Sequence, residues 1–420
     1  MATTTLHNPD RYMVDLRQIL SQGRKRVGLL IGAGAPTAVK VDDKGQLKDD
    51  GKPLIPDVAR LTDAVVNALP AADQGVIAKL KTKPDENPNI EAILTRVRRL
   101  AQAIASEKVH GLDATGYTSL AERICQEIGS KVGERLPDGQ TPFTELISWI
   151  GGTHRDHPVE IFTPNYDLLI EEAFERARLP YFDGFTGAHM PFFDPVSVSG
   201  DKLPPRWSRL WKIHGSLGWD VHGDSIIRTG LRTATKLIYP DHLKYDEVTR
   251  QPYSSLFEHL RQFLITPDTL LICSGFSFFD AHICAVLDEA LAANTHTAIF
   301  AFQYQNLDKE TLATKFAMNR PNLSVYARDG AVIFGVPGQW QPGQPPTDDW
   351  ESIRQTFWQA GTSKDPAQFL LGDFAKLARF FSLTQASKMI PAPTPAPTPA
   401  DPSASGTAPS PPAGGAHAKS

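Results

Sequence analysis

The chain has 420 residues, of which 41% are hydrophobic, and carries a formal net charge of −4 at pH 7. It is long enough to bury a large core, and its weak negative charge gives no global signature of nucleic-acid binding. No apolar run could span a bilayer and no secretory signal pattern is present, which predicts a cytoplasmic protein without membrane association. The odd number of cysteines (Cys125, Cys273 and Cys284) favours buried thiols in a reducing cytosol.

The first predicted elements are a helix and a buried strand. Apolar residues at helical spacing predict a helix from Tyr12 to Leu20, inside an N-terminal segment of residues 1–25. A strand follows at Val27–Ile31 and ends in Gly32-Ala33-Gly34. Glycines at such a turn let backbone N–H groups approach a phosphate, but the third glycine of the full dinucleotide fingerprint is missing. The motif alone does not decide between a phosphate loop and a generic turn.

A polar stretch and a helical region come next. Thr37–Lys52 is rich in Asp, Lys and Gly, which predicts a loop that can order over a ligand. From about residue 58 to 150 the pattern is helical and poor in strands, which indicates a helical insertion after the first strand. Two apolar stripes support the insertion: Ile90, Ile93, Leu94, Val97 and Leu100 in one, and Leu120, Ile124, Ile128 and Val132 in the other.

Strands then alternate with helices. Strand character appears at 159–163, 210–213, 269–274, 297–302 and 332–334, with helical patterns at 168–177, 256–263 and 283–291. This alternation predicts an α/β fold with a Rossmann-like parallel sheet that is covered by helices on both faces. We assign residues 26–336 to this domain.

The last part of the chain divides into two segments. Residues 345–386 carry two helical patterns, and the second is apolar enough to dock on the core or on another subunit. Residues 388–420 are rich in Pro, Ala and Ser and have no apolar periodicity. Such a composition cannot bury enough surface to offset its conformational entropy, so this tail is expected to be disordered.

Four polar loops directly follow predicted strands, and they begin at or near Gly32, Asn165, His214 and Gly275. Ligands of open parallel sheets bind beyond the carboxyl ends of the strands, so these loops are expected to form one site. Each also has a structural explanation by itself, because Asn after a strand is usually a turn or cap residue and His before Gly is usually a loop residue. The expected position of all four loops at one edge of the sheet favours a binding site over four separate structural explanations.

Five segments carry a family resemblance. Gly32-Ala33-Gly34, Ile55-Pro56-Asp57, Thr163-Pro164-Asn165-Tyr166-Asp167, His214-Gly215 and Gly275-Phe276-Ser277 occur in the order found in sirtuins. Over roughly Val27 to Gly335 the chain most resembles the bacterial sirtuin-like NAD hydrolases of antiphage defence. The helix from Asn89 and the stretch from Gly275 to His282 are similar to that branch. The length and the C-terminal helices resemble the subunit that partners a HerA-type ATPase.

The resemblance implies NAD as the substrate and gives roles to these positions. Asn165 and His214 are the expected catalytic pair, because a carboxamide can bind ribose hydroxyls and water and an imidazole can act as a general base near neutral pH. Asp280 is interpreted as the cap of the next helix and His282 as an orienting contact. The expected NAD-binding residues are Gly32, Ala33, Gly34 and Thr37 at the pyrophosphate, Asp57 at the nicotinamide amide, Asp167 at a ribose or its own loop, and Gly275 and Ser277 over ribose and phosphate.

The chain also departs from sirtuin deacylases. Pro36 and Pro164 stand where deacylases carry Ser and Gln, and no four-cysteine zinc module follows His214. We therefore expect no metal, and we favour an NAD glycohydrolase over a deacylase. The resemblance implies that this enzyme depletes NAD in abortive infection, as a homo-oligomer with a HerA-type ATPase as its partner. Two alternatives stay open: a zinc-less protein deacylase or ADP-ribosyltransferase, and a non-catalytic module that senses NAD or another nucleotide.

Overall fold

The computed structural model describes residues 5–80, 88–200, 203–204, 206–223, 225–234, 251–346 and 350–386. All of these belong to one folded unit, Met1–Ala386. The tail predicted to be disordered, residues 388–420, lies outside the described residues.

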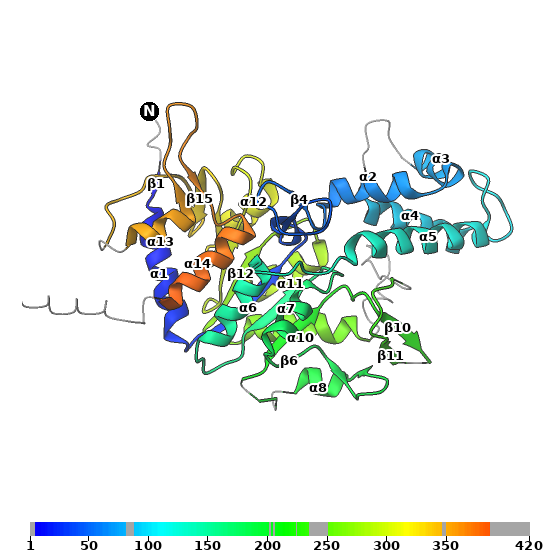
Figure 1. Ribbon diagram of the computed structural model, residues 1–420, viewed down its shortest axis with the longest axis horizontal. Coiled ribbons are helices and arrows are strands. Elements are labelled where there is room, and N and C mark those ends of the chain that lie inside the picture. The colour runs from blue at the N-terminus through cyan, green and yellow to red at the C-terminus, as the bar shows by residue number, and fades with distance from the viewer. Residues whose placement is uncertain are drawn as a thin grey trace, which may run out of the picture. The chain divides into compact units, whose positions relative to one another are not determined.

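A ten-stranded sheet forms the centre of this unit, in the order β1-β16-β15-β14-β13-β12-β2-β5-β9-β6 (Figure 1). The seven strands from β14 to β6 are parallel, whereas β15 pairs antiparallel with both of its neighbours. The predicted parallel sheet is therefore confirmed. The strands are β1 (Leu6–His7), β2 (Arg26–Ile31), β5 (Glu160–Thr163), β6 (Tyr181–Phe182), β9 (Ser208–Lys212), β12 (Thr269–Ser274), β13 (Ala298–Phe302), β14 (Leu323–Tyr326), β15 (Gly330–Ile333) and β16 (Val336–Trp340).

The strand order places a topological switch point beside β2. From β2 the chain continues to β5 and β9 on one side, and it then returns to β12 on the other side of β2. Folds of this kind bind ligands beyond the carboxyl ends of the strands at such a point. The predicted loops at Gly32 and Gly275 directly follow these two central strands.

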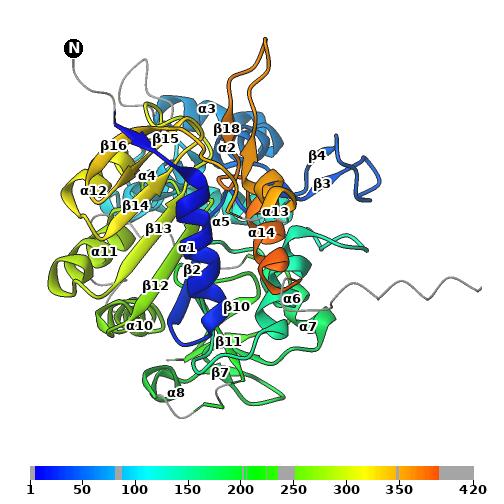
Figure 2. The ribbon, with the colours of Figure 1, turned by 90° about the vertical axis from the view of Figure 1, so that its left-hand side faces the viewer.

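Helices cover both faces of the sheet (Figure 2). Successive side chains of a strand point to opposite faces, so alternate residues of β2 enter separate cores. Leu29 and Ile31 belong to the core that includes α1, α6, α7 and α14, and Leu30 belongs to the core of α10 and α11. The helices are α1 (Pro9–Gln22), α2 (Val58–Ala68), α3 (Ala71–Lys79), α4 (Ile90–Ala103), α5 (Ala114–Val132), α6 (Pro142–Gly152), α7 (Leu169–Ala177), α8 (Pro195–Ser199), α10 (Tyr253–Ile265), α11 (Ala281–Ala293), α12 (Thr311–Asn319), α13 (Trp350–Phe357) and α14 (Phe374–Ala386).

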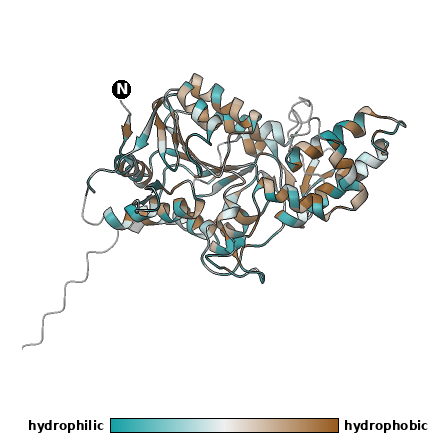
Figure 3. Cartoon of the chain, turned by 90° about the horizontal axis from the view of Figure 1, so that it is seen from above, coloured by the Kyte–Doolittle hydropathy of each residue, from teal (hydrophilic) through white to brown (hydrophobic). Residues whose placement is uncertain are grey.

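The predicted helical insertion is present between β2 and β5, and its helices α2 to α5 lie at the right of Figure 1. Side chains of Asp57, Asn89 and Asp113 cap the N-termini of α2, α4 and α5. The residues of both predicted stripes are buried, apart from Leu100, which is partly buried against the core. Helices at the right of Figure 3 show brown and teal faces, as expected for amphipathic helices such as α2 and α4.

The stretch from Thr37 to Lys52 is more ordered than the polar loop that its composition predicts. A short 3₁₀ turn, η1 (Pro36–Ala38), leads into an antiparallel ribbon of β3 (Lys40–Val41) and β4 (Lys52–Pro53). The Asp42 carboxylate accepts hydrogen bonds from the N–H groups of Lys44 and Gln46, both at 2.9 Å, which closes the turn. Figure 2 shows the ribbon at the right.

The C-terminal helix α14 docks on the core of its own chain. Its Phe381 stacks on Trp149 of α6 with ring centroids 4.6 Å apart. The ring centroid of its Phe374 lies 5.0 Å from that of Phe143, which also belongs to α6. The apolar face of this helix predicted docking on the core or on another subunit, and in the structure the helix packs on the core. Between α13 and α14 a short antiparallel pair forms, β17 (Trp358–Gln359) and β18 (Gln368–Phe369), which the sequence did not predict.

A second, four-stranded sheet forms between β6 and α10 and was also not predicted. Its order is β10-β11-β8-β7, and all of its pairings are antiparallel. The loop that begins at His214 leads directly into its strand β10. The strands are β7 (Phe185–Thr186), β8 (Phe192–Phe193), β10 (Trp219–His222) and β11 (Ser225–Arg228).

Candidate active site

The two glycine loops at the switch point are joined backbone to backbone. Gly32 N–H donates to the carbonyl oxygen of Ser274, and Gly34 N–H donates to that of Gly275, both at 2.9 Å. A Cβ on Gly32 would lie 2.3 Å from the oxygen of Gly275, and Gly275 has a φ of +64°. Any larger side chain would therefore push the loops apart.

This packing changes what the first loop can offer a phosphate. The N–H groups of Gly32 and Gly34 are already bonded to the neighbouring loop, and Thr37 Oγ1 donates to the carbonyl oxygen of Gly34 at 2.7 Å. Ala33 is exposed, and its N–H has no acceptor among the described residues. The tip of the loop at Ala33 therefore carries a free backbone donor.

Asn165 joins the loop after β5 to the glycine loop. Its Nδ2 donates to the carbonyl oxygen of Gly32 at 3.1 Å, and its backbone N–H donates to Thr163 Oγ1 at 3.1 Å. The residue is 8% exposed, and its Oδ1 has no partner within the described part of the chain. Buried amide oxygens are normally hydrogen-bonded, so Oδ1 is the atom of this side chain that is open to a ligand.

The predicted catalytic residues lie on loops that are bonded to each other. Strands β5 and β9 are neighbours, and Ile213 N–H donates to the carbonyl oxygen of Thr163 at 2.9 Å. Farther along, Leu217 N–H donates to the carbonyl oxygen of Tyr166 at 3.0 Å. The structure therefore brings the loops of Asn165 and His214 side by side at the carboxyl edge of the sheet, as the sequence predicts.

His214 is buried and faces a carboxylate from the loop after β12. Its Nε2 lies 3.0 Å from Asp280 Oδ2, although the two atoms are not aligned as in a good hydrogen bond. Asp280 Oδ1 accepts from Ile283 N–H at 2.9 Å and so also caps α11, the role that the sequence predicts. Burial raises the pKa of Asp280, but the close contact with His214, the hydrogen bond from Ile283 N–H and the charge of His282 together outweigh burial and lower it overall. His214 Nδ1 has no partner among the described residues.

The two roles of Asp280 can be separated by substitution. Asp280→Ser should keep the cap of α11 but not reach His214. We therefore expect a loss of about 1–3 kcal/mol in the free energy of unfolding, the range for a buried polar group that loses its partner. Asp113→Ser is the matched control, because Asp113 caps α5 through Gly116 N–H at 2.8 Å. It should cost at most a few tenths of a kcal/mol in urea unfolding, since Ser and Asp are similar caps. Equal losses at both positions would show that the contact with His214 contributes nothing.

Asp167 and Lys212 belong to a buried charge cluster between the loops. Lys212 is 2% exposed, and its Nζ donates to the carbonyl oxygen of Asp167 and lies 3.2 Å from Glu171 Oε1. Asp167 Oδ1 accepts from Leu169 N–H at 3.1 Å. Burial raises the pKa of Asp167 and of Glu171, and the charge of Lys212 offsets part of that rise. These contacts fit the role in orienting its own loop that was one of two predicted for Asp167.

Removing the cation from this cluster should destabilise the fold. We expect Lys212→Met to lower the free energy of unfolding by about 3–5 kcal/mol, because it leaves buried carboxylates without a counter-charge. Lys309→Met is the control, since Lys309 pairs with Asp308 at 3.4 Å on the surface, where its side chain is 71% exposed. Such a pair contributes at most about 1 kcal/mol. Similar urea midpoints for the two variants would contradict the assignment.

Two predicted residues stand apart from this network. Asp57 caps α2, where its Oδ1 accepts from Arg60 N–H at 2.9 Å, and its side chain is 47% exposed. Ser277 is exposed in the loop after β12. Within the described ranges neither makes a hydrogen bond or an ion pair with Asn165 or His214.

One residue that the sequence analysis left without a role lies near His214. Glu91 is in the first turn of α4, and burial raises the pKa of its carboxyl. The charge of His214 acts to lower that pKa and the charge of Asp280 acts to raise it. The insertion therefore places the charge of Glu91 within electrostatic reach of His214 and Asp280. The available sequence signal was an acidic residue directly after Asn89-Ile90, at the start of an apolar stripe.

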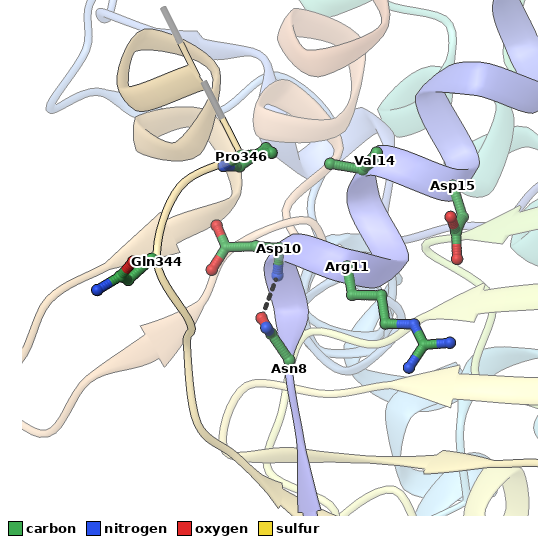
Figure 4. Close-up of a pocket in the computed structure, with 7 residues that line it drawn as sticks. All are labelled: Asn8, Asp10, Arg11, Val14, Asp15, Gln344 and Pro346. Carbon is green, nitrogen blue, oxygen red and sulfur yellow. Dashed lines mark hydrogen bonds between the residues drawn. The ribbon is translucent and has the colours of Figure 1, made fainter. Parts of the chain in front are cut away.

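A cavity of about 240 Å³ lies beside the start of α1 and includes none of the predicted site residues (Figure 4). Its Asp10 is bonded to Trp350 Nε1 at 3.0 Å and to Arg354 Nη2 at 2.6 Å, which ties α1 to α13. The residues that line the cavity are Asn8, Asp10, Arg11, Val14, Asp15, Gln344 and Pro346.

In the part of the chain that is described, no three His, Cys, Asp or Glu side chains are arranged to hold a metal ion, and no helix is long and apolar enough to cross a membrane.

Comparison with known proteins supports a sirtuin-like chain. Residues 159–322, less than half of the chain, match the family model of a SIR2-like domain. The match contains the loops of Asn165, His214 and Gly275 but not that of Gly32. No curated protein matches the chain.

A solved structure described as "Structural Basis for the Mechanism and Regulation of Sir2 Enzymes" aligns with 70% of this chain and 86% of its own chain. The aligned residues are 12% identical and the TM-score is 0.32. The likeness to SIR2-like domains therefore rests on the family model over residues 159–322, and the fold class rests on the strand order.

Proposed function

We propose that this chain is an NAD glycohydrolase, which cleaves the bond between nicotinamide and ribose and releases nicotinamide and ADP-ribose. The observation that carries the proposal is the position of Asn165 and His214 on two neighbouring loops that are hydrogen-bonded to each other, where Asn165 Oδ1 and His214 Nδ1 have no partner among the described residues. The SIR2-like match over 159–322 supports NAD as the substrate.

Cleavage of this bond does not need a general acid to protonate the leaving group. The nicotinamide nitrogen is cationic in NAD, so nicotinamide leaves as a neutral molecule when the C1′–N bond breaks, and positive charge develops at the ribose carbon. A water oxygen then forms the new bond to C1′ and loses a proton. Asn165 Oδ1 can orient that water or a ribose hydroxyl, and His214 can accept the proton and pass it to solvent. One NAD and one water give nicotinamide, ADP-ribose and one proton.

The remaining predicted residues fit binding roles in this proposal. The free N–H of Ala33 at the exposed loop tip can donate to the pyrophosphate, while Gly32, Gly34 and Gly275 hold the two loops close enough to form one surface. Asp57 caps α2 and pairs with Arg60, but its side chain is 47% exposed and can still reach the nicotinamide amide. Ser277 is exposed and is available for the ribose or phosphate.

We further propose that NAD cleavage serves antiphage defence in the cytoplasm by depleting NAD, and that the chain works as a homo-oligomer with a HerA-type ATPase as its partner. The sequence resemblance alone supports this part. Its test is co-expression with a HerA-type ATPase followed by light scattering of the purified proteins. Two separate species, each at its own mass, would refute the partnership.

A product analysis tests the catalytic proposal. The purified full-length chain is incubated with NAD, with and without a HerA-type partner, and nicotinamide, ADP-ribose and cyclic ADP-ribose are separated by chromatography. Equal amounts of nicotinamide and ADP-ribose are expected. Nicotinamide release only with an acylated peptide would favour a deacylase, transfer of ADP-ribose to protein would favour a transferase, and NAD binding without products would favour a sensing module.

A further inference from the structure

The hydroxyl of Thr163 joins two strand ends at the carboxyl edge of the sheet. Thr163 is the last residue of β5 and is completely buried. Its Oγ1 donates to the carbonyl oxygen of Ile31, the last residue of the neighbouring strand β2, at 2.7 Å. The same oxygen accepts from the backbone N–H of Asn165 at 3.1 Å. One hydroxyl therefore uses its donor and an acceptor position to hold the loop of Asn165 against the end of β2.

The side chain of Asn165 binds the next carbonyl group along the chain. Its Nδ2 donates to the carbonyl oxygen of Gly32, which directly follows Ile31, at 3.1 Å. Thr163 and Asn165 thus hold two consecutive carbonyl groups at the base of the glycine loop. Pro164 between them has no N–H, so Asn165 N–H is the first donor after the strand. Within the described residues this N–H has no acceptor other than the Thr163 hydroxyl.

The backbone of Thr163 is also bonded to the second catalytic loop. Its carbonyl oxygen accepts from Ile213 N–H at 2.9 Å, and His214 is the next residue. Thr163 is therefore bonded to the end of β2, to the backbone of Asn165 and to the residue before His214. A shift of Thr163 is expected to move the two catalytic side chains relative to each other and to the glycine loop.

We propose that Thr163 is a positioning residue of this site, whose hydroxyl sets the place of the Asn165 side chain relative to the glycine loop and to His214. This inference rests on the proposed NAD cleavage. Thr163 is 0% exposed, so it acts through Asn165 and does not itself touch the substrate. The effect on rate is large because a misplacement of about 1 Å in a reacting group can slow catalysis about 100-fold.

The test compares Thr163→Val, Thr163→Ser and Thr297→Val in the full-length chain. Valine has the shape of threonine without the hydroxyl, whereas serine keeps the hydroxyl. Thr297 is the matched control, because it is 1% exposed and its Oγ1 also makes two hydrogen bonds. It donates to the carbonyl oxygen of Leu264 at 2.6 Å and accepts from Asn294 Nδ2 at 2.8 Å. Thr297 precedes β13, however, and so lies at the amino ends of the parallel strands, away from the site.

The first readout is steady-state NAD cleavage per folded molecule. We expect Thr163→Val to lower kcat about 100-fold with a smaller change in KM, because the shift of Asn165 is felt mainly in the transition state. Thr163→Ser should restore most of kcat. Thr297→Val should lower the melting temperature to a similar degree but keep the wild-type kcat. An unchanged kcat in folded Thr163→Val overturns the inference, and so does a Thr163→Ser variant that is equally slow or an equal loss of kcat in Thr297→Val.

The second readout is hydrogen–deuterium exchange of Asn165 N–H, followed by mass spectrometry of overlapping peptides across the end of β5. This N–H should exchange slowly in the wild type and in Thr163→Ser, and about tenfold faster in Thr163→Val, as for the loss of one hydrogen bond. Rapid exchange in the wild type overturns the inference even if Thr163→Val does not fold. If the wild type cleaves no NAD, the proposed function fails by itself, and the exchange rates still decide whether the Thr163 hydroxyl holds Asn165 in place.

Discussion

Asn165→Ala is expected to lower kcat for NAD cleavage by about 10³-fold while the chain stays folded. The side chain offers Oδ1 to the water or ribose, and positioned groups of this kind typically contribute two to four orders of magnitude. The same substitution removes the hydrogen bond from Nδ2 to the carbonyl oxygen of Gly32, which costs about 1 kcal/mol of stability. His214→Ala should have a comparable effect on kcat, because it removes the proton acceptor.

A structural asparagine provides the control for this experiment. Asn294 Nδ2 donates to the carbonyl oxygen of Ile265 at 3.0 Å and to Thr297 Oγ1 at 2.8 Å, at the turn before β13 and outside the proposed site. Asn294→Ala should therefore destabilise the chain at least as much as Asn165→Ala, yet leave kcat per folded molecule near the wild-type value. Chromatographic nicotinamide release and thermal melts measure both quantities. Turnover that survives both Asn165→Ala and His214→Ala would falsify the catalytic assignment.

Much of the fold could be predicted because its signals are local. The buried strands β2 and β12 are mostly apolar, β5 and β9 carry a shorter apolar centre, and each is followed by a polar loop. Their alternation with helices indicates a parallel sheet. Strand order then brings those loops together without any further information. The helix α12 was missed for a local reason as well, because its buried face is made of the small residues Ala313 and Ala317. The strand β14 was also missed, although it is no shorter than β5.

The contacts inside the site could not be predicted, because they join residues that are far apart in the chain. Asp280 looks like a helix cap in sequence and is one, but its second oxygen faces His214 across the sheet edge. Glu91 looks like an ordinary acidic residue in the first turn of a helix, and its electrostatic interaction with His214 arises only in the folded chain. Sequence patterns report periodicity and local turns, and these two placements depend on neither.

The glycine motif shows a related ambiguity. Gly32-Ala33-Gly34 was interpreted as a loop shaped for a phosphate, whereas in the structure Gly32 and Gly34 pack against Gly275 and donate to that loop. Phosphate binding and packing against a neighbouring loop both favour glycine, because each requires a backbone that approaches another group closely. Substitution can measure the packing demand in the absence of any ligand.

Gly275→Ala is expected to lower the free energy of unfolding by about 2–5 kcal/mol. About 1–2 kcal/mol comes from forcing alanine into the left-handed region at φ +64°. A further 1–3 kcal/mol or so comes from overpacking, since the new Cβ would lie 2.5 Å from the backbone nitrogen of Ala35. Backbone atoms cannot turn aside as a flexible side chain can, so the two loops must separate.

Substitutions of two other glycines measure the conformational and the overpacking contributions to this stability loss separately. Gly45 has a φ of +77° and open space around its Cβ position, so Gly45→Ala should show only the conformational cost of about 1–2 kcal/mol. Gly32→Ala should show only the clash, because its Cβ would lie 2.3 Å from the oxygen of Gly275 and its φ is outside the left-handed region. Urea unfolding of the three variants measures the sum and both parts. If Gly275→Ala loses no more stability than Gly45→Ala, the loops are not held together by this backbone contact, and the glycines at the switch point would then owe their presence to the ligand instead.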